Sequence, residues 1–294
     1  MSEGRGIFSF DKSDLPTRVV SAAILLPLAI LPTWFGGTAF LLLVLVLALL
    51  VFYEWTRMSE CEQPQAWRIG EGLLLAFALL VTFGGLPGGG ILLLLLPLVA
   101  VPLVASGTVL FDQGVASGQS AGARDRRPLW LALGVLYAGV PSVALLALRA
   151  DAETGRLVLF FLLFVVWVTD IAAYFGGRAI GGKKLWPRVS PSKTWSGAAT
   201  GAAGALVVGI LFAVFTESRW ASAIGAALIL SVAAQLGDLG ESAMKRRFGA
   251  KDSGRLIPGH GGLMDRIDGL YAAAVVAVLL ALSGFAAPIP DWTQ

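Results

Sequence analysis

Long apolar stretches recur along almost the whole chain, separated by short polar segments. Stretches such as "AFLLLVLVLALLVF" and "ILLLLLPLVAVPLVA" contain no charged residue. A helix needs about 20 mostly apolar residues to cross a bilayer, and about nine stretches approach that length. They lie near residues 18–35, 37–55, 70–85, 91–110, 129–148, 156–175, 197–216, 221–241 and 269–287. The pattern predicts an all-α polytopic membrane protein with about nine transmembrane helices.

Composition supports this prediction and excludes an ordinary soluble domain. Hydrophobic residues make up 56% of the chain, charged residues only 14%, and the mean hydropathy is +0.79. If the N-terminus is cytoplasmic, all but three of the 22 lysines and arginines fall in cytoplasmic segments. The exceptions are Arg149, Arg156 and Arg219. The positive-inside rule therefore predicts a cytoplasmic N-terminus. Membrane topology explains where these cations lie, so we expect no nucleic-acid partner.

The two halves of the chain differ in their polar content. Residues 1–150 form apolar stretches with short loops, and we interpret them as N-terminal transmembrane scaffold helices. The change Glu54→Gln in this half is expected to matter little. Residues 151–294 carry nearly all the polar features, mainly in the cytoplasmic segments 176–196 and 242–268. We therefore expect the catalytic region to be the C-terminal one.

One polar cluster follows the sixth apolar stretch. Asp170 lies near its cytoplasmic end, where an ionised carboxylate is unfavourable, so it should face a polar cavity or a cationic partner. A structural aspartate bonded to a neighbouring helix is the alternative. Further on, "SPSKTWSG" predicts a helix N-terminus, with Ser190 as the cap and Ser192, Lys193 and Thr194 in the first turn. Such a terminus favours an anion, whereas a well-capped helix alone is the other interpretation.

Acidic residues also stand where the eighth stretch ends and the ninth begins. Asp238, Glu241 and Lys245 are spaced i, i+3 and i+7, so they share one helical face. Asp265 and Asp268 are spaced i, i+3 at the start of the ninth stretch. Carboxylate oxygens without clusters of histidine or cysteine suit a hard cation such as Mg²⁺, bound together with substrate phosphates. The nearby cations would neutralise those phosphates. A purely structural network of ion pairs is the alternative.

The chain's one histidine, His260, lies in "PGHGG" between glycines and a proline. Binding a phosphate, relaying a proton and ordering the loop are all chemically open to it.

These motifs resemble a known family. The stretch "SAMKRRFGAKDSGRLIPGHGGLMDRID", residues 242–268, is similar to the C-terminal signature of CDP-diacylglycerol synthases, also called phosphatidate cytidylyltransferases. The similarity extends upstream through "DIAAYFGGR", "SPSKTW" and "GDLGES". The family often has lysine where Ser192 stands and glutamate where Ser196 stands.

The resemblance implies a multi-helix membrane enzyme, commonly a homodimer, that converts CTP and phosphatidate into CDP-diacylglycerol and pyrophosphate. It also implies a divalent metal ion such as Mg²⁺ at Asp238 and Asp265, with K⁺ as a companion ion. Together with the distribution of cations, it implies a bacterial inner membrane and an active site that faces the cytoplasm.

The residues expected to act in this reaction come from the matching motifs. The catalytic candidates are Asp238, Lys245, Lys251, Asp265 and Asp268. The substrate-binding candidates are Asp170, Ser190, Ser192, Lys193, Thr194, Arg246, His260 and Arg266.

Three other functions compete with this one. An enzyme that uses CTP on a polyprenyl or dolichyl lipid would use the same pocket. A CDP-alcohol phosphotransferase is disfavoured, because Asp265 and Asp268 lack the spacing and the Asp-Gly-x-x-Ala-Arg frame of that family. A secondary transporter would place ionisable residues near the middle of the membrane, often in two related halves. Here the charges gather at one face and in one half of the chain.

Overall fold

The computed structural model describes residues 15–59, 65–98 and 127–283, and within them the fold is helical. The labelled helices are α1 (Leu15–Phe35), α2 (Gly37–Met58), α3 (Gln65–Phe83), α5 (Arg127–Leu148), α6 (Thr154–Ile180), α7 (Trp195–Thr216), α8 (Trp220–Arg247) and α9 (Met264–Leu282). A shorter apolar helix, Pro87–Leu98, follows α3. Strands β1 (Lys184–Trp186) and β2 (Ser190–Thr194) form one small antiparallel hairpin between α6 and α7.

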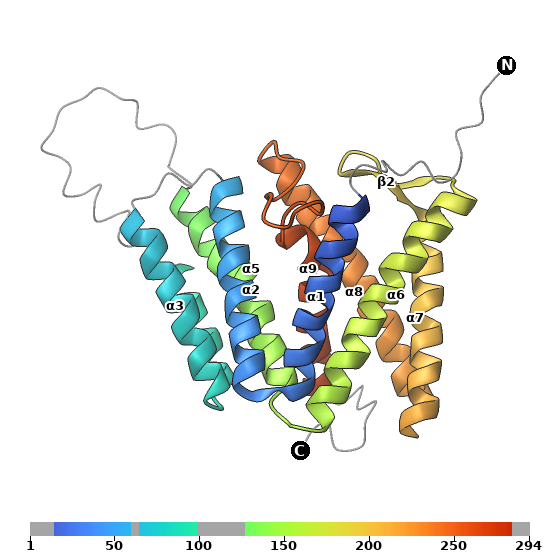
Figure 1. The fold of residues 1–294 in the computed structure, drawn as a ribbon, viewed down its shortest axis with the longest axis horizontal. Coiled ribbons are helices and arrows are strands. Elements are labelled where there is room, and N and C mark those ends of the chain that lie inside the picture. Colours follow the sequence, from blue (N-terminus) through green and yellow to red (C-terminus); the bar gives the residue numbers. More distant parts are fainter. Residues whose placement is uncertain (1–14, 60–64, 99–126, 284–294) are drawn as a thin grey trace, which may run out of the picture.

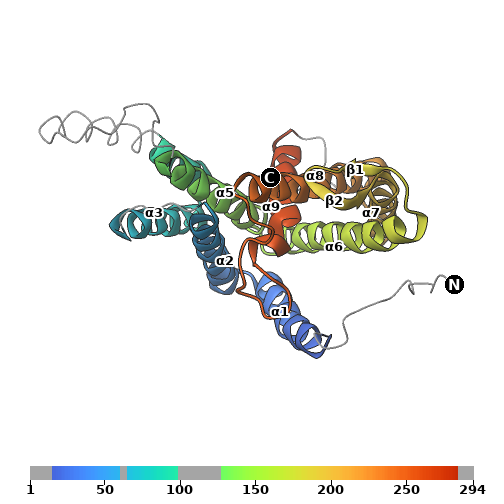
Figure 2. The same ribbon diagram turned by 90° about the horizontal axis from the view of Figure 1, so that it is seen from above.

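The helices form two groups that meet at α9. Helices α2, α3 and α5 pack together on one side, and α6, α7 and α8 pack together on the other (Figures 1 and 2). Helix α9 contacts α5, α6 and α8, so it joins the two groups. Helix α1 packs against α2 and, over a smaller area, against α6. The C-terminal region is therefore built directly onto the N-terminal one.

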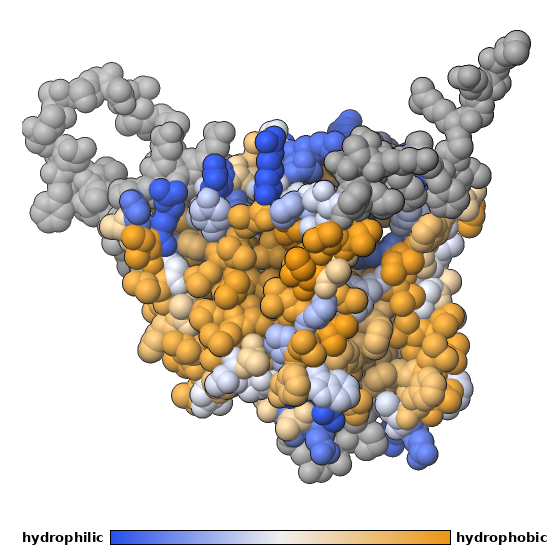
Figure 3. Space-filling model, in the orientation of Figure 1, coloured by the Kyte–Doolittle hydropathy of each residue, from blue (hydrophilic) through white to orange (hydrophobic). Residues whose placement is uncertain are grey.

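The face of the bundle seen in Figure 3 is covered by apolar residues along its middle, with hydrophilic residues gathered at its two ends. Among the described residues, five helices are long and apolar enough to cross a membrane. They are Gly37–Met58, Leu129–Leu148, Thr154–Ile180, Trp195–Thr216 and Trp220–Arg247. These confirm an all-α membrane protein and match five of the expected spans.

The remaining expected spans are not established by length and composition. The apolar stretch of α1, Val19–Phe35, is shorter than the five, and α9 carries three charged residues within its first five positions. The expected span 91–110 lies partly outside the described residues, and the span 70–85, which falls mostly in α3, is not among the five. A count of about nine spans and a cytoplasmic N-terminus therefore stay predictions.

The hairpin and the segment 248–263, which connects α8 to α9, lie at the same end of the bundle (Figure 1). The opposite end holds the junction of α1 and α2. There Arg149 donates hydrogen bonds to the carbonyls of Thr33 and Trp34, at 3.0 and 3.1 Å, and Arg156 stacks over the Trp34 ring. Two of the three cations expected outside the cell thus lie away from the hairpin.

We predict that the hairpin end faces the cytoplasm. A reporter that is active only in the cytoplasm should be active when fused within segment 248–263 and inactive when fused after Gln294. The reason is the distribution of lysine and arginine, which orients membrane proteins during insertion. A cytoplasmic signal from the C-terminal fusion would contradict the combination of a cytoplasmic N-terminus with an odd number of spans.

Small residues let α6 and α7 approach closely. A Cβ atom added to Gly177 would lie 3.2 Å from Cα of Gly197, and one added to Gly201 would lie 3.0 Å from the Thr169 carbonyl oxygen. The glycines of α7 thus serve helix packing. This packing also fixes the C-terminal half of α6, which carries Asp170, next to the first half of α7.

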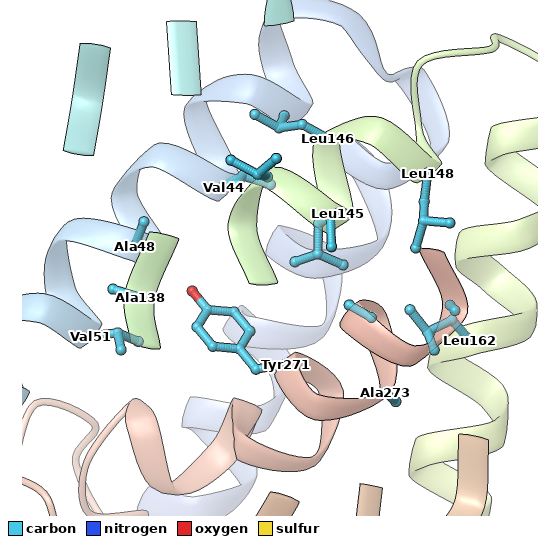
Figure 4. Close-up of a cluster of buried hydrophobic side chains, with 14 of the residues drawn as sticks. Val44, Ala48, Val51, Ala138, Leu145, Leu146, Leu148, Leu162, Tyr271 and Ala273 are labelled. Carbon is cyan, nitrogen blue, oxygen red and sulfur yellow. The ribbon is translucent and has the colours of Figure 1, made fainter. Parts of the chain in front are cut away.

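The buried core continues from the N-terminal helices into α9. Tyr271 of α9 points toward Ala138 of α5, with Val44 and Ala48 of α2 nearby (Figure 4). Its hydroxyl lies 3.1 Å from Oγ of Ser142, within hydrogen-bond distance. Helix α9 is therefore held in place by the half of the chain that the sequence analysis treats as scaffold.

Candidate active site

The segment Ser190–Thr194 is a strand, and the prediction that it forms the first turn of α7 is wrong. A residue before proline is restricted to extended backbone, so Pro191 favours a strand at this point. The segment pairs with β1 at Ser190 and Thr194, the two ends of the strand. Helix α7 begins at Trp195 instead, and its N-cap is Thr194, whose Oγ1 accepts a hydrogen bond from the Gly197 amide at 3.0 Å.

The strand nevertheless places a lysine beside the acidic face of α8. Lys193 forms an ion pair with Asp238, and both side chains are only partly exposed. Ser190 is buried, whereas Ser192 is exposed and its carbonyl oxygen lies 3.4 Å from Nζ of Lys184. Of the predicted residues of this segment, Lys193 is therefore the one that reaches the acidic residues.

Three acidic side chains meet where α8 and α9 lie side by side. Ligand atoms of Asp238, Glu241 and Asp268 all lie within 4.8 Å of one another. We call these three residues the carboxylate cluster. Asp170 of α6, which was expected to face a polar cavity or a cationic partner, lies close enough to interact electrostatically with Asp238 and with Lys193. Elements α6, β2, α8 and α9 thus converge on one site.

Asp265 lies beside the carboxylate cluster but is not a member of it. Its Oδ1 atom accepts a bond from Nζ of Lys245 at 2.7 Å, and its carboxylate also accepts from the amides of Ser253 at 3.2 Å and Gly262 at 3.1 Å. The same Lys245 nitrogen lies 2.6 Å from Oε2 of Glu241. Lys245, which is buried, therefore links Asp265 to the cluster. The structure does not place Asp265 and Asp238 in one group of ligand atoms.

The other predicted basic residues bind backbone or face outward. Arg246 donates to the carbonyl oxygens of Val189 and Ala250, at 3.4 and 3.2 Å. Arg266 donates to the carbonyl of His260, which ties down the loop that contains the histidine. Lys251 is exposed. In the described part of the chain, the ion pairs to these acidic residues come from two lysines, Lys193 of β2 and Lys245, which is the one basic residue of segment 242–268 that takes part.

Glu54 joins the N-terminal half to the candidate site, so the expectation that Glu54→Gln matters little loses its basis. Glu54 of α2 is 1% exposed. Its carboxylate accepts hydrogen bonds from Oγ of Ser253 at 3.0 Å, from the Leu263 amide at 3.0 Å and from the Met264 amide at 2.8 Å. A carboxylate inside an apolar stretch is unfavourable without such partners, and this was the available signal.

An apolar cavity of about 500 Å³ opens next to the carboxylate cluster. Its wall comes from α2, α5, α8 and α9, and includes Trp55, Tyr137, Met244 and Tyr271. Asp268 lines this cavity and also belongs to the carboxylate cluster. The cavity therefore joins an apolar space within the bundle to an acidic site near its polar end.

The donor atoms of the carboxylate cluster fit a hard divalent cation. All three side chains offer oxygen, the ligand type that Mg²⁺ prefers. Three carboxylates this close repel one another, and a cation between them would relieve the repulsion. Lys193 and Lys245 each neutralise part of that charge from one side. An acidic pocket with adjacent lysines can hold a metal ion together with an anionic ligand.

Comparison with known proteins identifies the family. A family model described as the cytidylyltransferase family matches residues 16–283. The phosphatidate cytidylyltransferase of Brucella suis biovar 1 (strain 1330) is 44% identical over 278 residues, covering 91% of this chain and 93% of the relative. The protein of the same name from Bacillus subtilis (strain 168) is 32% identical, covering 92% of this chain and 98% of the relative. The one from Pseudomonas aeruginosa is 36% identical, covering 93% of this chain and 100% of the relative. Because the match spans nearly the whole chain, the protein belongs to the cytidylyltransferase family.

Proposed function

We propose that the protein is a phosphatidate cytidylyltransferase, which makes CDP-diacylglycerol and pyrophosphate from CTP and phosphatidate. A phosphate oxygen of phosphatidate attacks the α-phosphorus of CTP, and the bond from that phosphorus to the bridging oxygen of the β-phosphate breaks. Pyrophosphate leaves with the bonding electrons. The attacking phosphate is already anionic, so the reaction needs no general base.

One observation carries this proposal beyond family membership. The carboxylate cluster and the apolar cavity share Asp268, and Lys193 and Lys245 pair with the other two members of the cluster. A reaction between a charged nucleotide and a charged lipid needs a site with this dual character. Because phosphoryl-type transfer depends mainly on positioning and on charge stabilisation, positive side chains are the groups expected to act. Lys193 and Lys245 lie where phosphates could replace their present carboxylate partners.

The cavity supports a lipid as the acceptor. Its lining is apolar apart from Asp268 and the hydroxyls of Tyr137 and Tyr271, so it suits the glycerol and acyl part of phosphatidate. A lipid held there would place its phosphate toward Asp268 and the two lysines. The headgroup would then lie next to the nucleotide.

Mg²⁺ would be held by Asp238 with Asp268 and Glu241, the members of the carboxylate cluster. When bound, it would supply positive charge that offsets the charge of the triphosphate. The pair Asp238 and Asp265, which the resemblance implies, stays a prediction, as does K⁺ as a companion ion. For Asp265, the bonds to Lys245 and to two backbone amides favour a role in holding the site together.

We further propose that the site faces the cytoplasm from a bacterial inner membrane, where CTP is available. The relatives are bacterial, and the hairpin end carries the predicted cytoplasmic segments. The homodimer implied by the resemblance stays a prediction.

The choice of lipid acceptor is the test of this proposal. Detergent-purified protein with labelled CTP and Mg²⁺ should form a labelled lipid with phosphatidate, and little or none with a polyprenyl phosphate. Preference for the polyprenyl phosphate would favour the competing function. No labelled lipid with either acceptor, from correctly folded protein, would overturn the assignment as a cytidylyltransferase of lipids.

Lys193→Ala should lower kcat/KM for CTP by about 10–100-fold, the loss of one hydrogen bond to a charged group. Lys184→Ala is the matched control, because this exposed lysine contacts only a backbone carbonyl in the described residues. Thr194→Ala should mainly reduce stability, by about 0.5–2 kcal/mol, through loss of the α7 cap. Steady-state kinetics and thermal unfolding separate the two effects. If Lys193→Ala behaves like Lys184→Ala, strand β2 has no role in phosphate binding.

A further inference from the structure

A single carboxylate from the N-terminal half holds the C-terminal signature segment at two points. Glu54 accepts from Ser253, five residues into segment 248–263, and from Leu263 and Met264, where α9 begins. Both carboxylate oxygens are used, since Oε1 binds the Leu263 amide and Oε2 binds the other two donors. Cutting these bonds would release the segment at two points at once.

Glu54 replaces a cap that α9 lacks in its own sequence. Residue Leu263 occupies the N-cap position of α9, and its side chain makes no capping hydrogen bond. The first amides of a helix have no partner within it, and its positive end favours an anion. The buried carboxylate of Glu54 supplies both the acceptor and the negative charge, from a helix about 200 residues away in sequence.

The segment fits closely around this carboxylate. A Cβ atom added to Gly254 would lie 2.5 Å from Oε1 of Glu54, and one added to Gly262 would lie 2.9 Å from the same atom. Ser253 and Gly262 also donate their backbone amides to Asp265. Ser253 therefore binds both Glu54 and Asp265. Gly262, which binds Asp265, directly precedes Leu263 and Met264, which bind Glu54 where the helix carrying Asp268 begins.

We propose that Glu54 is a positioning residue for the reaction, acting from α2 through segment 248–263 and the first turn of α9. It sets the position of Asp265 and Asp268 and, through Asp265, of Lys245. It does not touch the substrates. Its effect on catalysis rests on the proposed function, whereas its effect on the segment does not.

Glu54→Gln is the direct test, because it keeps the size of the side chain. Glutamine replaces one acceptor oxygen by an NH₂ group, which would face a hydrogen-bond donor. We expect hydrogen exchange in peptides covering 252–265 to become about 10–100-fold faster, while α6 and α7 stay protected. We expect kcat to fall by a similar factor of about 10–100, with KM for CTP changed less than about threefold.

Glu71→Gln is the matched control. Glu71 of α3 is also buried and also in the N-terminal half, but its carboxylate makes no hydrogen bond within the described residues. Its replacement should leave both exchange in 252–265 and kcat near those of the parent protein. Ser253→Ala, which removes one of the three donors, should give a smaller change of the same kind.

Glu54→Asp keeps the charge and should recover part of the protection and part of kcat, which a general loss of folding would not allow. Unchanged exchange in 252–265 in Glu54→Gln would overturn the proposal, whatever the activity. Faster exchange with unchanged kcat would overturn the catalytic part alone. The exchange measurement needs no substrate, so it remains decisive even if the parent protein shows no cytidylyltransferase activity.

Discussion

Asp238→Asn should lower kcat at limiting Mg²⁺ by at least about 100-fold while leaving the protein folded and membrane-inserted. The expected loss is at least that seen when groups supporting a metal site are changed. Asp238 belongs to the carboxylate cluster and is also the ion-pair partner of Lys193 in β2, so removing its charge affects both the cluster and the ion pair. Asparagine keeps the shape and removes the charge. Pyrophosphate release from the purified variant, across a Mg²⁺ titration, measures the effect.

Asp151→Asn is the control for this variant. Asp151 lies at the other end of the bundle, where the Thr154 and Glu153 amides donate hydrogen bonds to it and lower its pKa. It is therefore ionised at neutral pH. Asp151→Asn should change stability slightly and leave kcat unchanged. Near-normal turnover of Asp238→Asn at limiting Mg²⁺ would remove this residue from the metal site.

Asp265→Asn and Asp268→Asn should both abolish most activity, but only the second should respond to Mg²⁺. Asp268 is a member of the carboxylate cluster, so its loss should weaken metal binding and be partly reversed by excess Mg²⁺. Asp265 holds Lys245 and two backbone amides, so its loss should lower kcat at every Mg²⁺ concentration. Removing one partner of a buried ion pair also costs about 3–5 kcal/mol of stability.

The comparison of these two variants decides between two arrangements of the metal site. Recovery of Asp265→Asn by Mg²⁺, with none for Asp268→Asn, would support the pair Asp238 and Asp265 that the family resemblance implies. It would also show that the ion pair between Lys245 and Asp265 opens when CTP and metal bind.

Local spacing predicted the acidic face of α8 correctly. Asp238, Glu241 and Lys245 were expected on one helical face, and Lys245 does pair with Glu241, four residues before it. The helical period determines such placements, so no tertiary information is needed. The start of α9 was equally accessible, because two aspartates three residues apart precede a long apolar run.

The hairpin was not predicted, because a serine and the proline after it both favoured the start of a helix. Ser190 followed by Pro191 is typical of a helix start, yet the extended backbone that proline imposes on the preceding residue suits a strand as well. Pairing with β1 decided the outcome, and β1 is too short to be recognised from its own sequence. Thr194, which the prediction placed inside the first turn, became the cap.

Glu54 escaped prediction for a different reason. Its partners lie about 200 residues further along the chain, and two of them are backbone amides, which carry no signature in the sequence. A buried glutamate in an apolar stretch shows only that some partner exists. Which partner it has depends on the packing of α2 against the start of α9, so the N-terminal half is more than a scaffold.

Transfer of label from CTP tests the central claim most directly. With phosphatidate and Mg²⁺, CTP labelled at the α-phosphate should pass its label into the lipid, while label at the γ-phosphate should appear in pyrophosphate in equal amount. Nucleotidyl transfer at the α-phosphorus requires both results together. Label from the γ-phosphate in the lipid, or no label in the lipid from either position, would contradict it.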